Sequence, residues 1–203
     1  MDLTVPYELT GRTNQKARTR EALIRATREL LARGVTPTME GAAAEAAISR
    51  TTAYRYFPSL RALLVAAYPH IDEPSLLGDS PPGDVVARIE LVARDQTRRI
   101  LEYEPEMRAV LRLSLDPGPE RDAPDLPMNR GLRIGWIEDA LAPLSCRLAR
   151  RELRQLVHGI GATLGIESFV WLTDVAGLSR EQAAATMRLN AVRLVRAAQA
   201  EHL

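Results

Sequence analysis

Hydrophobic positions recur at helical spacing along most of the chain, and the first clear stripe lies in residues 13–33. Ala22, Leu23, Ala26 and Leu30 share one face of that segment, which predicts an amphipathic helix. Gly34 follows it, and a glycine just beyond the last periodic residue is a common helix stop. Residues 1–11 lack such a stripe and are expected to form a loose arm.

Three shorter segments follow, and a hydroxyl residue precedes each of them. Thr38, Ser49 and Ser59 stand before residues 39–47, 50–57 and 60–68. Serine and threonine are favoured N-caps because their side-chain oxygen accepts a hydrogen bond from a free backbone N–H of the first turn. The pattern therefore predicts three short helices after the first long one.

The rest of the chain predicts a second, larger group of helices. Proline and glycine gather in residues 70–84 and mark a connector, so the expected domains are 1–70 and 71–203. Gly177 and Ser179 separate the last two helices. The expected helices of this part are 85–103, 106–115, 129–142, 148–176 and 180–201.

Composition supports an all-α fold of about nine helices. Alanine, leucine, arginine and glutamate dominate, and these are strong helix formers. Cys146 is the single cysteine, so no intrachain disulfide forms, and we expect a buried thiol in a reducing, cytoplasmic protein. No apolar stretch approaches the length of a membrane span, so no membrane contact is expected.

Charge is divided unevenly between the two predicted domains. The whole chain carries a formal net charge of +1, but residues 1–70 carry +4 and residues 71–203 carry −3. A basic N-terminal domain suits a polyanionic partner such as nucleic acid.

Residues 49–58, with the sequence SRTTAYRYFP, contain the most specific chemistry of the chain. Arginines and hydroxyls donate to phosphates, and short polar side chains read base edges in the major groove. A small-residue helix, a tight turn and this polar-aromatic helix together indicate helix-turn-helix DNA binding.

Residues 38–64, TMEGAAAEAAISRTTAYRYFPSLRALL, resemble the tetracycline-repressor (TetR) family of bacterial regulators, and the resemblance extends over residues 13–68. It implies an N-terminal three-helix helix-turn-helix DNA-binding domain, followed by a larger helical bundle for ligand binding and dimerisation. It also implies that the partner is double-stranded DNA with a palindromic operator.

The resemblance assigns roles within the first domain. Arg50, Thr51 and Thr52 are expected to face base edges, Arg55 to contact either bases or backbone, and Phe57 to lie in the core. The remaining expected DNA contacts are Thr38, Ser49, Tyr54, Tyr56, Arg61 and Lys16.

Two departures from the family pattern affect these roles. Ala47 stands where a glycine usually makes the turn, so a left-handed backbone there is strained. Leu60 stands at a position where the family commonly has a lysine that binds a DNA phosphate. Arg61, Lys16 or Arg12 is the candidate to make that phosphate contact instead.

The second domain is expected to form a homodimer through helices 148–176 and 180–201. Small or apolar residues recur at alternating spacings of three and four in the last helix, which is typical of a packing seam. The seam residues are Ala184, Met187, Ala191, Leu194 and Ala198. Gly159, Gly161 and Gly165 in the preceding helix suit close backbone approach.

The family resemblance also implies a small-molecule effector, which we expect to be mostly apolar and whose identity the sequence leaves open. The candidate effector-binding residues are Tyr103, Met107, Leu111, Trp136, His158, Phe169 and Trp171. The alternative is a helix-turn-helix regulator without a small-molecule effector. Such a regulator would be controlled by a protein partner or would act as an activator.

An enzyme is the competing class of function. Glu138 and Asp139 are adjacent and do not converge on one helix face. The three histidines are far apart in sequence, and Cys146 has no identifiable base. We therefore expect no catalytic residues, no metal and no cofactor.

Overall fold

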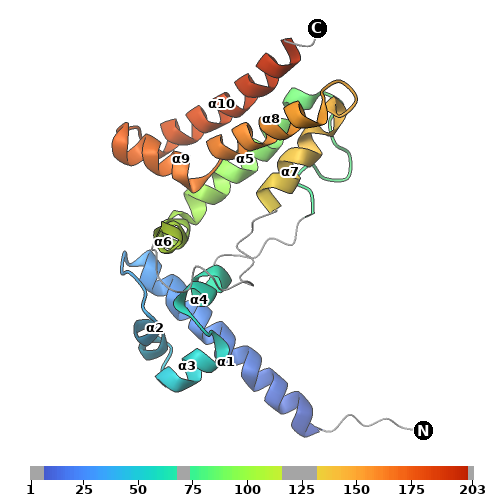
Figure 1. The fold of residues 1–203 in the computed structure, drawn as a ribbon. Helices are drawn as coiled ribbons and strands as arrows, with labels where there is room; N and C mark the ends of the chain where they lie inside the picture. The colour runs from blue at the N-terminus through green and yellow to red at the C-terminus, as the bar shows by residue number, and fades with distance from the viewer. Residues whose placement is uncertain (1–6, 68–73, 116–131, 201–203) are drawn as a thin grey trace, which may run out of the picture. The chain divides into compact units, whose positions relative to one another are not determined.

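The computed structural model describes residues 7–67, 74–115 and 132–200, and these form ten α-helices with no strand among them (Figure 1). Within these ranges no single helix has the length and apolarity to cross a membrane. One bent pair of segments, Arg150–Thr163 with Ile166–Val175, passes on length and composition alone. The described residues belong to two compact units.

The first unit is built from α1 (Tyr7–Ala32), α2 (Met39–Glu45), α3 (Arg50–Tyr56) and α4 (Leu60–Ala67). The predicted loose arm over residues 1–11 is wrong from Tyr7 onward, where α1 begins. A single glycine such as Gly11 weakens a helix by about 1 kcal/mol without stopping it. Residues 1–6 lie outside the described residues.

The core of the first unit gathers one face of each of its four helices. Phe57, at the end of α3, is 3% exposed and packs in a cluster with α1 and α4, which confirms its predicted core role. The Arg28 guanidinium of α1 donates to the Ala67 carbonyl of α4 over 2.7 Å. Burial of the Phe57 ring therefore fixes the end of α3 against its neighbours, and the Arg28 hydrogen bond joins α1 to α4. The main cluster members are Leu23, Ile24, Leu30, Met39, Ala42, Ala53, Phe57 and Leu63.

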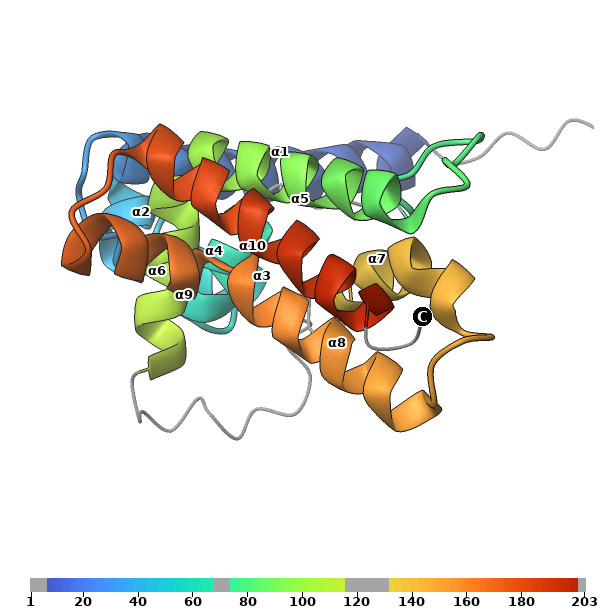
Figure 2. The ribbon, with the colours of Figure 1, turned by 90° about the horizontal axis from the view of Figure 1, so that it is seen from above.

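The second unit comprises α5 (Val85–Glu102), α6 (Glu104–Leu115) up to Leu111, α7 (Leu132–Leu141), α8 (Arg150–Thr163), α9 (Ile166–Val170) and α10 (Arg180–Ala200). Figure 2 shows α10 beside α5 and α8, and α7 also packs on α5 and α8. The compact grouping places Arg112 and the last turn of α6 with the first unit. The domain division at residue 70 stays a prediction.

The predicted single helix over 148–176 is wrong, because it is interrupted after Thr163. Gly165 is buried and extended, with φ −93° and ψ 163°, and it begins α9. A Cβ at this position would approach the side-chain ends of Arg133 and Glu167, which would have to shift to make room for it. After α9 the chain makes a π-helical turn, Trp171–Val175.

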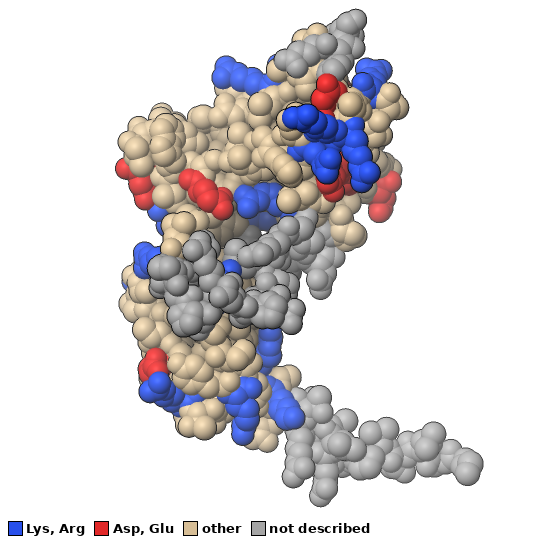
Figure 3. Space-filling model, viewed as in Figure 1, with Lys and Arg blue, Asp and Glu red and all other residues tan. Residues whose placement is uncertain are grey.

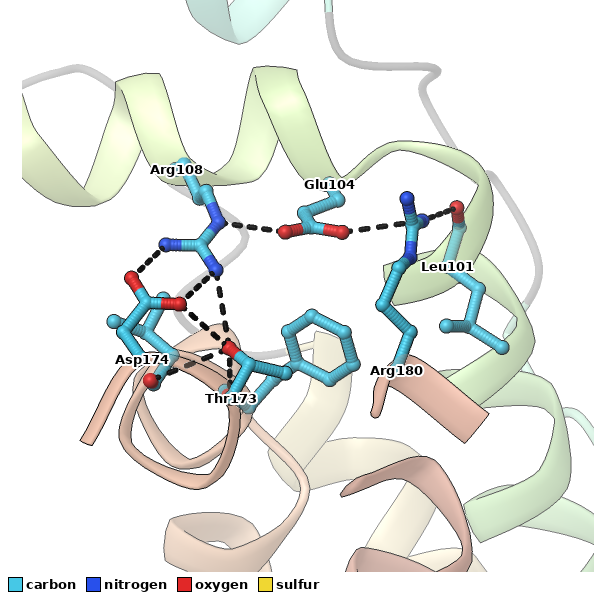
Figure 4. A network of polar contacts seen from close by, with 8 residues as sticks. Leu101, Glu104, Arg108, Thr173, Asp174 and Arg180 are labelled. Carbon is cyan, nitrogen blue, oxygen red and sulfur yellow. Dashed lines mark hydrogen bonds and ion pairs between the residues drawn. The ribbon is translucent and has the colours of Figure 1, made fainter. Parts of the chain in front are cut away.

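A polar network joins three elements of the second unit, α6, the π-helical turn and the start of α10 (Figure 4). Arg108 pairs with Glu104 at 2.7 Å and with both oxygens of Asp174 at 2.7 and 2.8 Å. Arg180 pairs with Glu104 at 3.1 Å and donates to the Leu101 carbonyl over 2.7 Å. Arg108 lowers the pKa of the Asp174 carboxyl to about 2, chiefly by hydrogen bonding.

Two further sequence predictions are wrong. The seam residues Ala184, Met187 and Ala191 are at most 1% exposed within a single chain, so they form its own core. Cys146 is exposed, because Leu144 and Leu148 take the buried positions of that segment. Both errors arise because a local pattern shows that a position is apolar without showing what covers it.

Candidate nucleic-acid interface

Each short helix of the first unit begins at its predicted hydroxyl cap. Thr38 Oγ1 accepts from the Gly41 N–H over 2.9 Å. Ser49 Oγ accepts from the Thr52 N–H over 3.2 Å, and Ser59 Oγ accepts from the Ala62 N–H over 3.2 Å. These bonds satisfy backbone donors that the first turn leaves free. The three caps are confirmed, and they set where α2, α3 and α4 start.

The turn between α2 and α3 depends on a strained alanine. Ala47 has φ 54°, and among the described residues it is the non-glycine residue with positive φ. Its neighbour Ile48 closes α2 by donating to the Ala43 carbonyl over 2.8 Å. The left-handed conformation expected at Ala47 is therefore confirmed. It orients α3 relative to α2 at a conformational cost.

One face of α3 presents cationic and aromatic side chains to solvent. The Arg50 side chain is 68% exposed, and Thr51, Tyr54 and Arg55 are exposed as well. The Arg50 guanidinium lies 5.6 Å from the Tyr54 ring centroid, and Arg55 lies equally far from Tyr56. Stacking on an aromatic face orients a guanidinium. Figure 3 shows Lys and Arg side chains gathered along the lower edge of the first unit.

Ser49, Thr52 and Tyr56 are less free than the sequence suggested. Ser49 Oγ donates to Thr52 Oγ1 over 2.9 Å, and Thr52 is half-buried. Tyr56 is also half-buried and packs against the core of the first unit, whereas Tyr54 is 40% exposed. Of the two tyrosines, Tyr54 is therefore the more accessible to a ligand.

The candidate backbone contacts outside α3 have different surroundings. Lys16, on α1, is exposed, and the side chain of Arg12 lies outside the described residues. Leu60 is half-buried at the start of α4. Beside it, Arg61 is half-buried and its Nε is enclosed without a hydrogen-bond partner. Whether any of the three cations replaces the family lysine stays a prediction.

Glu40, which the sequence analysis did not single out, pairs with Arg50 of α3. Its carboxylate lies 2.9 Å from Arg50 Nε, across the turn between α2 and α3. The two residues are ten positions apart and come from different helices, so no helical spacing links them. A second pair, Arg33 and Glu45, joins the end of α1 to α2 at 2.8 Å, and this hydrogen bond lowers the pKa of Glu45.

The candidate effector residues of the second unit differ widely in exposure. Trp136 is 4% exposed and Phe169 is fully buried, whereas Trp171 is 58% exposed and His158 is also exposed. Tyr103, Met107 and Leu111 are half-buried. The assignment of these seven residues to one site stays a prediction. Across the described ranges no cluster of three His, Cys, Asp or Glu residues could hold a metal.

Comparison with known proteins identifies the segment that contains this interface. Residues 23–67 match the family model described as bacterial regulatory proteins, tetR family. The match covers residues 23–32 of α1 and all of α2, α3 and α4. No curated protein and no solved structure matches the chain.

Proposed function

We propose, from the match of residues 23–67 to the family model described as bacterial regulatory proteins, tetR family, that this chain is a DNA-binding transcriptional regulator that represses from a palindromic operator. The observation that carries the proposal is the exposed face of α3, with Arg50 and Arg55 held on a short helix between a serine cap and a buried phenylalanine. A recognition helix needs such firm support, because base edges are read by a few side chains in fixed positions.

On this proposal Arg50, Thr51 and Arg55 read base edges, and Tyr54 contacts the backbone. Arginine reads guanine through two parallel hydrogen bonds. Glu40 holds Arg50 in the free protein, but both side chains are at least half exposed, and such pairs contribute no more than about 1 kcal/mol. DNA can therefore displace Glu40 at small cost.

The proposed DNA-binding form of the protein is a homodimer. Two copies related by a twofold axis place two α3 helices on half-sites about one turn of DNA apart, which explains an expected palindrome. The predicted seam of α10 is intrachain core, so we assign the contact to the outward faces of α8 and α10, where Leu189 is 46% exposed. The mass of the protein in solution tests this assignment.

We further propose that a small effector bound in the second unit releases the operator. It would do so by favouring a protomer geometry in which the two recognition helices no longer match the half-site spacing. A regulator without an effector, controlled by a protein partner or acting as an activator, is the alternative. Ligand-induced thermal stabilisation separates the two, since a ligand at 100 times its Kd adds about 2.7 kcal/mol.

The direct test replaces both arginines of the exposed face. Wild-type protein first selects its operator from random duplexes, and Arg50→Ala/Arg55→Ala is then measured by gel shift across a salt series. We expect a loss of about 1–3 kcal/mol for each arginine that reads a base. A phosphate contact would instead weaken all sequences alike and reduce the salt slope by about one.

The matched control is Arg94→Ala/Arg147→Ala, which removes the same charge from exposed positions of the second unit that lie outside α8 and α10. It should keep operator affinity and selectivity. Equal binding by wild type and the α3 double variant would refute the recognition-helix assignment, and failure to enrich any sequence would refute the proposed function.

A further inference from the structure

The core of the second unit contains a polar side chain whose hydrogen-bonding capacity is not met. Gln96 of α5 is 7% exposed, and its Nε2 is fully enclosed without a hydrogen-bond partner. A buried donor without an acceptor is costly, so this atom calls for an explanation.

The position of Gln96 on α5 shows which way it faces. It lies three residues after Ala93 and four before Ile100, both at most 2% exposed, so it belongs to the middle of the buried face. The next residue, Thr97, meets α10, where Arg188 Nη1 donates to its hydroxyl over 3.2 Å. Arg99, three residues after Gln96, has its guanidinium carbon 5.7 Å from the ring centroid of Trp136 on α7. Gln96 therefore faces the interior between α7 and α10.

Arg188, next to this position, is a half-buried residue without an acidic partner among the residues that the structure describes. Other arginines of the same unit are paired, Arg88 with Asp139, Arg99 with Asp95 and Arg108 with Asp174. A partly desolvated charge without a counter-charge is costly. Arg188 thus presents a cation without a counter-charge, and Gln96 presents a neutral donor without an acceptor.

We propose that the second unit binds a small, mostly apolar monocarboxylate, whose acid group accepts hydrogen bonds from Arg188 and from the Gln96 amide. The two oxygens of a carboxylate can accept from both donors at once, and charge-assisted bonds of this kind are the strong ones. The adjoining residues of the buried face, Val92, Ala93 and Ile100, are apolar and suit a hydrocarbon body. This inference rests on the effector part of the proposed function and names the chemical class of that effector.

The test measures binding to the full chain without DNA. Thermal unfolding is followed with decanoate and with 4-phenylbutyrate, and each acid is compared with its alcohol, decanol or 4-phenylbutanol. We expect both acids to raise the unfolding midpoint of the wild type and the alcohols to raise it less. Arg188→Met and Gln96→Leu should each weaken binding of the acids by about tenfold or more.

Arg193→Met is the matched control, because it removes the same charge from an exposed position on the same helix, and it should bind the acids as wild type does. Without ligand, Gln96→Leu should unfold at or above the wild-type midpoint, since an unpaired buried donor has been removed. If Arg188→Met does not fold, Gln96→Leu and Arg188→Lys supply the comparison, and Arg188→Lys should retain part of the affinity.

The inference is overturned if neither acid stabilises the wild type, or if the acids bind equally well to the Arg188 and Gln96 variants and to the control. A failure of DNA binding leaves this measurement unaffected, so it would count against the proposed function alone. Binding of the acids without release of the operator would support the carboxylate site and refute the effector role.

Discussion

At the scale of single residues, Ala47 shows how one backbone conformation sets up the DNA-binding helix. With φ 54° it occupies a region where an L side chain crowds the following carbonyl. The turn nevertheless forms, because the buried faces of α2 and α3 on either side of it pack into one core. The strain is local, and its removal is a direct test of the turn.

Ala47→Gly should stabilise the protein by about 1 kcal/mol, because glycine adopts positive φ without steric cost. Urea unfolding measures the change. Ala46→Gly is the control, since Ala46 has φ −79°, and it should lose about 0.5–1 kcal/mol. Destabilisation by both substitutions would show that Ala47 is not strained.

At the scale of elements, the short helices of the first unit depend on their caps. The α3 helix has seven residues, too few for stability on its own, since isolated helices shorter than about 12 residues are marginal. The Ser49 bond to the Thr52 N–H and the burial of Ala53 and Phe57 therefore hold α3 together. In the second unit, Gly165 has the opposite effect and interrupts a helix that the apolar pattern would continue.

Ser49→Ala should lower the free energy of unfolding by about 1 kcal/mol, and Ser49→Asp should preserve it, because aspartate caps as well as serine. For DNA binding we expect a different order of the two variants. The aspartate adds negative charge at the start of the proposed recognition helix, so operator affinity should fall more for Ser49→Asp than for Ser49→Ala. Thermal unfolding and gel shifts measure the two effects, and wild-type DNA binding by Ser49→Asp would contradict the placement of Ser49 near phosphate.

At the scale of the whole molecule, the second unit has a polar network at one end of its bundle and an exposed apolar residue on α10. The network joins α6 to the π-helical turn through Arg108 and Asp174. Leu189 lies on the outward face of α10. The first feature predicts a pH dependence of stability, and the second predicts an effect on oligomeric state.

Asp174 has a pKa lowered from 3.8 to about 2. A carboxyl whose pKa is depressed by folding contributes stability above its unfolded value, and this contribution is lost as the pH falls through the folded value. Asp174→Asn should therefore show a smaller fall in unfolding midpoint than wild type between pH 3.8 and about 2. Asp79→Asn, at an exposed position, is the control and should follow wild type. Identical pH profiles for wild type and Asp174→Asn would show that the pair does not persist in solution.

Leu189→Glu should convert the proposed dimer into monomers, because it places a charge in an interface that excludes water. Light scattering after gel filtration measures the mass. Ile134→Glu makes the same kind of change on α7, where the side chain is 38% exposed, and should leave the dimer intact. If Leu189→Glu were still a dimer, the dimer interface would not lie on this face of α10.

The sequence by itself determined the all-α class, the starts of α2, α3, α4 and α10, the strained Ala47 and the core role of Phe57. These features follow from local physics, since caps, turn conformations and apolar periodicity act within a few residues of the chain. The candidate recognition helix was predictable for the same reason.

Only the tertiary structure decided what covers each apolar face and which distant charges meet. It assigned Ala184, Met187 and Ala191 to the chain's own core, exposed Cys146 and interrupted the predicted helix over 148–176 after Thr163. It also brought Glu40 to Arg50 and left Gln96 without a partner. Such contacts join residues far apart along the chain, so they depend on how helices pack, and spacing within one helix does not encode that packing.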